Sequence, residues 1–277
     1  MKQPFQSLYI ELLKRTLIDY SKINSYEYHP LSIVNVNWKT HILFWLDKLL
    51  RTRKFAICKL KFVEEKNRLN GYDWPANATT MIGLNRLNNI EYCIYSIIND
   101  NVPGDFIETG VWRGGAAILM RGVLKELEIA DRKVWLADSF MGLPKPDEKN
   151  YKADKGNKLY KIKILKSSLE EVRNNFKAYD LLDEQVIFLE GWFKDTLPKA
   201  PVDKLSLLRL DGDMYESTIQ ALLNLYPKLS AGGYIIIDDY NAFHNCKQAV
   251  TDYRMDYNIN EPIIEIDEQA VYWRKKL

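Results

Sequence analysis

The sequence predicts an α/β protein with a mostly parallel sheet, helices on both of its faces, and a helical extension at the N-terminus. From about residue 80, short apolar segments alternate with stretches of helical periodicity, which is typical of a parallel sheet. The last two apolar segments are separated only by Asp267-Glu268-Gln269, so we expect a terminal hairpin whose second strand lies antiparallel at the sheet edge. The seven expected strands are Asp105–Thr109, Val134–Ala137, Val186–Leu189, Leu205–Leu210, Tyr234–Ile237, Ile263–Ile266 and Ala270–Trp273.

Residues 1–75 form the expected extension, and residues 76–277 the main domain. Apolar residues recur at helical spacing over Leu8–Ile18 and Ile42–Leu50, and no strand alternation is visible. The basic run Arg51–Lys61 is expected to be a solvated helix face. The extension could cap a functional site, form a dimer interface, or both. In the main domain we expect helices at Asn85–Asn99, Ala116–Leu127, Leu169–Tyr179 and Ser217–Tyr226.

Composition excludes few classes of function. The chain has 277 residues, 47% of them hydrophobic, and a formal net charge of +2, which gives no sign of a nucleic-acid or membrane partner. The three cysteines, Cys58, Cys93 and Cys246, fit neither a disulfide framework nor a zinc cluster, so each is expected to be buried. The N-terminus lacks a signal-peptide core, and Ile42–Leu50 is too short to span a bilayer, so we expect a cytoplasmic protein.

A glycine-containing turn follows the first strand, with the sequence Glu108-Thr109-Gly110-Val111-Trp112-Arg113-Gly114-Gly115. In an open parallel sheet, ligands bind at the carboxyl ends of the strands, and Gly110 lets the backbone approach such a ligand closely. The acidic Glu108 suits a cofactor with a cationic amino group and would repel a pyrophosphate. No phosphate-binding loop of the nucleotide triphosphatase type occurs.

The second strand ends in Asp138-Ser139-Phe140, where a carboxylate can accept both ribose hydroxyls of an adenosine. Together with the turn at Gly110, this favours S-adenosylmethionine over NAD as the cofactor. A helix N-cap is the alternative role for Asp138.

Three carboxylates follow two strands that we expect to be neighbours. Asp211 comes after Leu205–Leu210, and Asp238 and Asp239 come after Tyr234–Ile237. Carboxylates so close repel one another unless they are protonated or neutralised by a cation. Oxygen ligands suit a hard ion, with Mg²⁺ first, and such an ion beside a methyl donor could activate an acceptor hydroxyl. The alternative is that Asp211 and Asp239 cap helices. Asp213 could cap the helix expected from Ser217 and is left outside the metal site.

These motifs, together with Gly191-Trp192-Phe193-Lys194-Asp195 and Asp213-Met214-Tyr215-Glu216-Ser217, resemble the macrocin O-methyltransferase (TylF-type) family, whose members methylate sugar hydroxyls of natural products. The similarity covers about residues 77–255. It implies a class I methyltransferase fold of the Rossmann-like type, magnesium dependence, and a homodimer or higher homo-oligomer.

The resemblance also implies roles for individual residues. Asp211, Asp238 and Asp239 would hold the metal, with Asp211 as the catalytic residue. The residues expected near the cofactor are Thr80, Met81, Glu108, Thr109, Gly110, Val111, Trp112, Asp138, Ser139, Phe140, Ser168, Gly191, Trp192 and Asp195.

The chain departs from the family pattern in parts that would face the acceptor. Residues 21–75 are longer and more basic than in the macrolide enzymes, and the polar loop after the second strand has no histidine at Tyr151–Tyr160. The proton acceptor would then be Asp211, a metal-bound hydroxide or water, with His244 as a further candidate. A catechol or phenol methyltransferase, a non-catalytic cofactor-binding scaffold and an NAD-dependent enzyme are the alternatives to a sugar O-methyltransferase.

Overall fold

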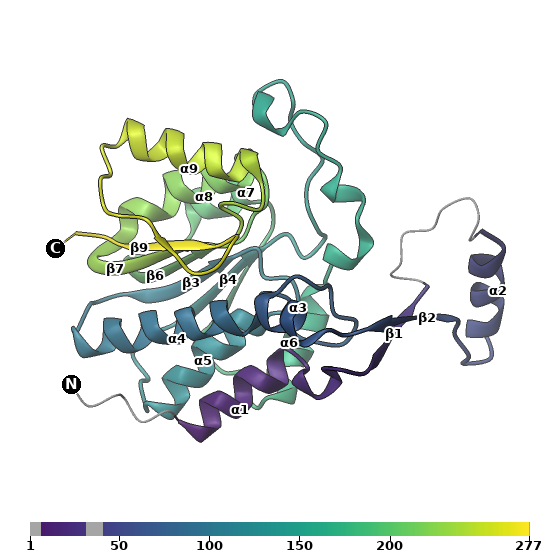
Figure 1. Cartoon of the computed structure of the whole chain (residues 1–277). Helices are drawn as coiled ribbons and strands as arrows, with labels where there is room; N and C mark the ends of the chain where they lie inside the picture. Colours follow the sequence, from purple (N-terminus) through teal and green to yellow (C-terminus); the bar gives the residue numbers. More distant parts are fainter. Residues whose placement is uncertain (1–6, 32–40, 277) are drawn as a thin grey trace.

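A seven-stranded sheet organises the chain in the computed structural model, which describes residues 7–31 and 41–276 (Figure 1). The strand order is β5-β4-β3-β6-β7-β9-β8. The strands β3 to β7 run parallel to one another, whereas β9 is antiparallel to both β7 and β8. The strands are β3 (Asp105–Thr109), β4 (Val134–Asp138), β5 (Val186–Glu190), β6 (Leu205–Leu210), β7 (Leu229–Ile237), β8 (Ile264–Glu265) and β9 (Val271–Arg274). The fold predicted from the sequence is confirmed.

Helices cover both faces of this sheet, as Figure 1 shows. Because side chains alternate along a strand, Phe106 of β3 belongs to one buried cluster and Ile107 to the other. The first cluster includes side chains of four helices, α1 (Leu8–Leu17), α4 (Gly83–Asn99), α5 (Gly115–Glu126) and α6 (Leu169–Ala178). The second includes α8 (Tyr215–Leu225) and α9 (His244–Asp256). The short α3 (Glu65–Asn70) packs against the first cluster through Leu69, and α7 (Phe193–Thr196) against the second through Phe193.

The strand β7 begins earlier than predicted. Ser230–Gly233 resembles a turn in sequence, but it continues the strand, because Leu229 pairs with Leu205 and Gly232 N–H donates to the Lys275 carbonyl over 3.0 Å. Pairing on both sides of β7 therefore overrides the local preference for a turn.

The expectation of a mostly helical extension without strands is wrong in one respect, because the structure adds two strands to its helices. The strands β1 (Tyr26–Pro30) and β2 (Cys58–Phe62) form an antiparallel ribbon in which Tyr26 pairs with Phe62. The basic run Arg51–Lys61 is thus the end of α2 (His41–Arg51), a turn and most of β2. The sequence misled because this ribbon buries polar residues: Glu27 is 1% exposed and accepts bonds from Arg68 and from the Ala76 backbone.

We define the arm as residues 26–31 and 41–62. The helix α1 is not part of the arm, because its residues Ile10, Leu13 and Leu17 belong to the main core. The arm projects from the body on the right of Figure 1. Cys58 lies exposed on it, against the expectation of burial, whereas Cys93 and Cys246 are buried. No helix of the described ranges 7–31 and 41–276 is long and apolar enough to cross a membrane.

Candidate functional site

The carboxyl ends of β3 to β7 meet around a cavity of about 510 Å³. The loop after β3 reaches the loop after β4, because Asp138 accepts a hydrogen bond from Val111 N–H over 2.7 Å and a second one from Phe140 N–H over 2.7 Å. Asp138 therefore joins two loops rather than capping a helix. Burial raises the pKa of its carboxyl, although these backbone bonds oppose the shift.

Gly110 brings the loop after β3 into contact with the strand that carries Asp211. Its φ is +80°, and a Cβ at this position would lie 1.6 Å from the Asp211 carbonyl oxygen. The Asp211 N–H in turn donates to the Thr109 carbonyl over 2.9 Å. Glycine is required at position 110 because of its positive φ and because of this close contact, since any side chain would push the two strand ends apart.

Three left-handed residues other than glycine mark the same ends of the strands. They are Trp112 after β3, Phe140 after β4 and Asp213 after β6, with φ between 47° and 57°. Such conformations cost of order 1–3 kcal/mol each and concentrate at ligand sites. The loops at the carboxyl ends of these strands therefore contain backbone strain, whose free-energy cost the rest of the fold must offset.

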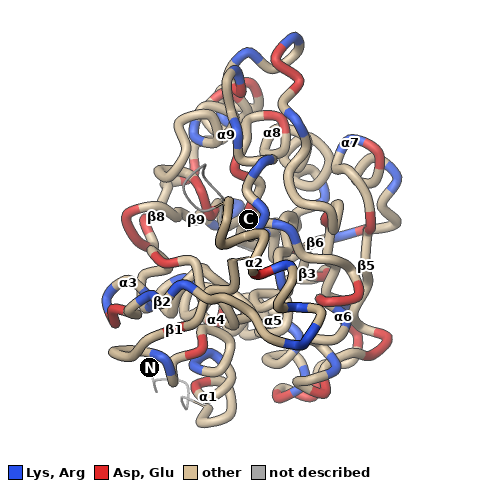
Figure 2. Tube along the Cα trace, turned by 90° about the vertical axis from the view of Figure 1, so that its right-hand side faces the viewer, with Lys and Arg blue, Asp and Glu red and all other residues tan. Residues whose placement is uncertain are grey.

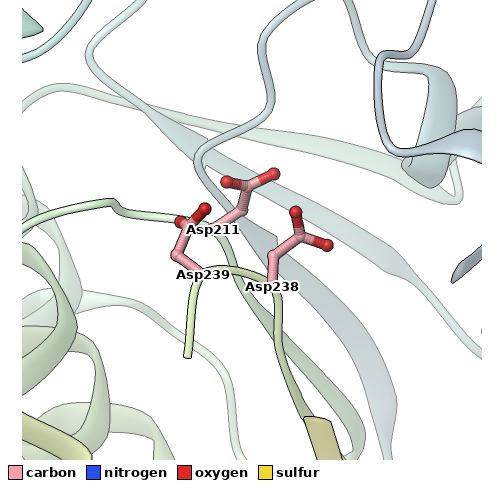
Figure 3. A group of neighbouring side chains, drawn as sticks. All are labelled: Asp211, Asp238 and Asp239. Carbon is pink, nitrogen blue, oxygen red and sulfur yellow. The ribbon is translucent and has the colours of Figure 1, made fainter. Parts of the chain in front are cut away.

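The three predicted metal ligands come together at the ends of β6 and β7 (Figure 3). One carboxylate oxygen each of Asp211, Asp238 and Asp239 can be chosen so that all lie within 4.8 Å of one another. Asp238 and Asp239 are buried, and the Asp211 side chain is 26% exposed. Asp213 lines the same cavity, and its backbone N–H donates to Asp239 over 3.0 Å.

Two buried arginines, which the sequence reasoning missed, hold this cluster. Arg209 is 1% exposed and donates to Glu108 over 2.6 Å, to Asp211 over 3.0 Å and to Asp238 over 2.5 Å. Arg86 of α4 donates to the other oxygen of Asp238 over 2.6 Å. The available signal was an arginine inside the apolar strand β6, because a buried charge is almost always paired.

Burial and mutual repulsion change the proton affinities of the acids. Burial and Asp238 raise the pKa of Asp211 to about 6, although Arg209 opposes the shift. Burial, with Asp211 and Asp238, raises the pKa of Asp213 to about 8. Burial and Asp213 also raise the pKa of Asp239. Although burial would raise the pKa of Asp238, Arg209 and Arg86 lower it.

This donor set fits a hard divalent cation. All the candidate ligand atoms are carboxylate oxygens, and Asp211, Asp213, Asp238 and Asp239 outnumber the two arginines that reach them. An added cation would relieve the repulsion that raises the pKa values.

The cavity brings most of the predicted residues together, and four of them lie outside its lining. Glu108 lines it, but its two oxygens already accept from Arg209 and from Ala117 N–H at the start of α5. Ser168 is exposed and caps α6 through the Glu171 N–H. The predicted residues that line the cavity are Thr80, Met81, Glu108, Gly110, Val111, Trp112, Asp138, Ser139, Gly191, Trp192, Asp211, Asp238 and Asp239, and those that do not are Thr109, Phe140, Ser168 and Asp195.

Two further expectations about nearby residues differ from the structure. Asp213 does not cap the helix expected from Ser217, because α8 begins at Tyr215 and its first N–H groups donate to Asp154. His244, the further candidate for the proton acceptor, is exposed at the start of α9 and is not among the residues that line the cavity.

Comparison with known proteins gives the same assignment along almost the whole chain. The macrocin O-methyltransferase (TylF) family matches residues 6–275. A demethyldecarbamoylnovobiocin O-methyltransferase from Streptomyces niveus is 56% identical over 212 residues, which are 76% of this chain and 81% of that protein. An 8-demethyl-8-(2,3-dimethoxy-α-L-rhamnosyl)-tetracenomycin-C 4'-O-methyltransferase from Streptomyces olivaceus is 53% identical over 208 residues, 75% of this chain and 79% of that protein. The structure of the O-methyltransferase NovP superposes with a TM-score of 0.82 at 46% identity, covering 98% of this chain and 99% of NovP. This chain therefore belongs to the macrocin O-methyltransferase (TylF) family and is an S-adenosylmethionine-dependent O-methyltransferase.

Proposed function

We propose that this enzyme methylates a hydroxyl of a sugar, in a natural product or a surface glycan, with the help of Mg²⁺ or another hard divalent cation. The observation that carries the proposal is the cluster of Asp211, Asp238 and Asp239 beside the glycine turn of the cofactor loop. The name of the Streptomyces olivaceus relative contains a rhamnosyl group, which supports a sugar as the acceptor.

Different residues around the cavity would bind the cofactor and take part in methyl transfer. Asp138 and the turn at Gly110 would bind the cofactor at the ends of β3 and β4, and Gly191 and Trp192 would flank its adenine. A bound Mg²⁺ would lower the pKa of the acceptor hydroxyl, which is the chemistry that a Lewis acid supplies. As the new O–CH₃ bond forms, the S–CH₃ bond breaks and the hydroxyl proton passes to a carboxylate. The products are a methyl ether and S-adenosylhomocysteine.

Asp211 is the proposed proton acceptor. Its side chain lines the cavity and is 26% exposed, whereas those of Asp238 and Asp239 are buried. Asp213 lines the same cavity, and it is the second candidate for this role.

The test is methyl transfer by Asp211→Ala. With Mg²⁺ present, demethyldecarbamoylnovobiocin and the rhamnosyl tetracenomycin are offered as acceptors, and catechol as the flat alternative. We expect the wild-type enzyme to methylate a sugar-bearing acceptor, and Asp211→Ala to lose at least about 100-fold in kcat while S-adenosylhomocysteine affinity changes little. Asp203→Ala, an exposed residue before the opposite end of β6, is the control. Undiminished turnover by Asp211→Ala, or methylation of catechol alone, would overturn the proposal.

We further propose that the predicted N-terminal extension acts as an oligomer contact, mainly through the arm. In helix α2 the usual pattern of burial is reversed, so that a polar side chain is buried and apolar side chains are exposed to solvent. Asp47 is its buried residue, 2% exposed and bonded to the Ile57 N–H, whereas large apolar side chains face outward. The exposed apolar residues of the arm are Tyr26, Tyr28, Ile42, Leu43, Trp45, Leu46, Leu49, Leu50, Phe55, Leu60 and Phe62.

The partner that we propose is a second copy of this chain, as the family resemblance implies. Residues 41–62 contain six Lys or Arg and one acidic residue, whereas the whole chain has a net charge of +2, so the remainder carries an excess of three negative charges. Figure 2 views the molecule from the side on which the arm projects, and basic and acidic residues are spread over the body behind it. The exposed apolar side chains of the arm are of the kind that marks an interaction surface, and a homo-oligomer would bury them between identical copies.

Light scattering after size exclusion tests this contact. We expect the wild-type protein to be a dimer or larger, and Leu46→Glu with Leu49→Glu to shift it towards the monomer. Leu223→Glu, a 47%-exposed leucine of α8, should leave the mass unchanged. A monomeric wild-type protein, or one that binds anionic vesicles through the arm instead, would contradict the proposal.

A further inference from the structure

The chain between β4 and α6 forms one wall of the cavity, and we call residues 143–165 the strap. It contributes Pro144, Lys145, Asp147 and Leu159 to the lining. In Figure 1 the strap is the teal segment that extends from the strand edge beside the helices above the sheet. Polar loops of this length are often mobile lids, but the contacts of the strap in the structure are those of a fixed element.

Both ends of the strap lie beside the loops after β3 and β4. Its start follows directly on the turn after β4, in which the Ser139 hydroxyl donates to the Gly142 carbonyl over 2.7 Å. Near its end, the Trp112 indole N–H donates to the Ile164 carbonyl over 2.7 Å. Of these two bonds, the second reaches the strap itself and holds its end beside the loop after β3.

Asp154 fixes the middle of the strap on the opposite side. Its side chain is 1% exposed, and its carboxylate accepts from Tyr215 N–H over 2.8 Å, from Glu216 N–H over 2.9 Å and from the Asn245 amide over 2.7 Å. The N-cap of α8, Met214, makes no side-chain bond to this helix end, so Asp154 supplies the cap from a distant part of the chain. A negative charge at a helix N-terminus is also favoured by the helix dipole.

The helix that Asp154 caps begins directly after Asp211-Gly212-Asp213 and lines the cavity through Glu216, Ser217 and Gln220. The ring of Tyr151, also in the strap, lies 6.1 Å from the ring of Tyr215. The strap therefore crosses from the cofactor loops to the helix that follows the acidic cluster. An acceptor bound at the carboxylates would lie beside this wall of the cavity.

We infer that Asp154 is a positioning residue for the acceptor: it fixes the strap as a rigid wall beside the acidic cluster and has no part in binding the cofactor. The inference rests on the proposed function for the chemical class of the acceptor. Its physical content, a wall pinned by one buried carboxylate, does not depend on which acceptor the enzyme uses.

Hydrogen exchange of the enzyme loaded with S-adenosylhomocysteine tests the wall. Asp154→Ala removes all three contacts and Asp154→Asn keeps part of them. We expect amide exchange in peptides from residues 143–163 to rise at least about tenfold in the alanine variant and less in the asparagine variant. S-adenosylhomocysteine affinity by calorimetry should stay within about twofold. Asn245→Ala, which removes one contact, guards against a general folding defect, and Asp203→Ala, at an exposed residue, is the matched control.

Steady-state kinetics distinguish a positioning role of Asp154 from a merely structural one. With whichever sugar-bearing acceptor the wild-type enzyme methylates, Asp154→Asn should raise the acceptor KM at least about fivefold and leave the KM for S-adenosylmethionine unchanged. Unchanged exchange in the strap, or equal losses of cofactor and acceptor affinity, would overturn the inference. If the wild type methylates catechol alone, the proposed function fails, and exchange and calorimetry still decide the role of Asp154.

Discussion

Replacing Gly110 by alanine is expected to damage the cofactor loop and the acidic cluster together. The substitution has two costs. A residue with a side chain at φ +80° loses about 1–2 kcal/mol relative to glycine. The new Cβ would also lie 1.6 Å from the Asp211 carbonyl oxygen, where contacts under 3.0 Å force a neighbour to move. The neighbour here is backbone, which cannot rotate away as a side chain would, so we add the upper range for overpacking, about 2–3 kcal/mol.

Gly156 offers a matched control for the first cost. Its φ is also +80°, but nothing lies within 4 Å of the Cβ that alanine would add. Gly156→Ala should therefore lose only about 1–2 kcal/mol of unfolding free energy, whereas Gly110→Ala should lose about 3–5 kcal/mol. The difference between the two variants isolates the close approach of the cofactor loop to Asp211.

Denaturant unfolding followed by circular dichroism measures both values, and calorimetry measures ligand affinity. We expect Gly110→Ala to weaken S-adenosylhomocysteine and Mg²⁺ binding at least about tenfold each, because one displaced peptide belongs to both sites. Equal losses of stability in the two variants, with normal ligand affinities in Gly110→Ala, would show that the strand ends are not in contact and refute this reasoning.

Three other outcomes follow from the charges around the cavity. Arg209→Met leaves Glu108 and Asp238 buried beside a neutral side chain and should cost about 3–5 kcal/mol of unfolding free energy; urea unfolding checks this, and a loss no larger than that of an exposed control such as Arg53→Met would contradict it. Mg²⁺ binding at pH 7 should release protons, since the pKa of Asp213 is raised to about 8 and that of Asp211 to about 6, so affinity should increase as pH rises from 6 to 8. Calorimetry in buffers of different ionisation enthalpy measures this release, and a pH-independent affinity would count against a metal site built on these carboxylates. Asp138→Ala should weaken the binding of S-adenosylhomocysteine at least about tenfold and leave Mg²⁺ affinity unchanged, because it frees the Val111 and Phe140 N–H groups without reaching the acidic cluster. An equal loss of affinity for both ligands would contradict the assignment of Asp138 to the cofactor alone.

The sequence by itself determined the sheet and the position of the acids along it. Buried strands such as Leu205–Leu210 are continuous apolar segments bounded by polar residues, and this local pattern is sufficient to predict a strand. Because all parallel strands end at one edge, the order Leu210-Asp211 and Ile237-Asp238-Asp239 also predicted that three carboxylates meet there, and the structure brings them together.

Only the tertiary structure decided which charges compensate these acids and which face of the N-terminal ribbon is buried. Arg86 and Asp238 are 152 residues apart, and Asp154 and Tyr215 are 61 apart, so no local spacing relates them. The ribbon buries Glu27 and exposes Tyr26 and Tyr28, which inverts the usual pattern of amphipathicity. Periodicity reports whether one face of an element is apolar, but it does not report what lies against that face. A buried polar residue depends on a partner that only the folded chain supplies, and for that reason these contacts were not predictable from the sequence.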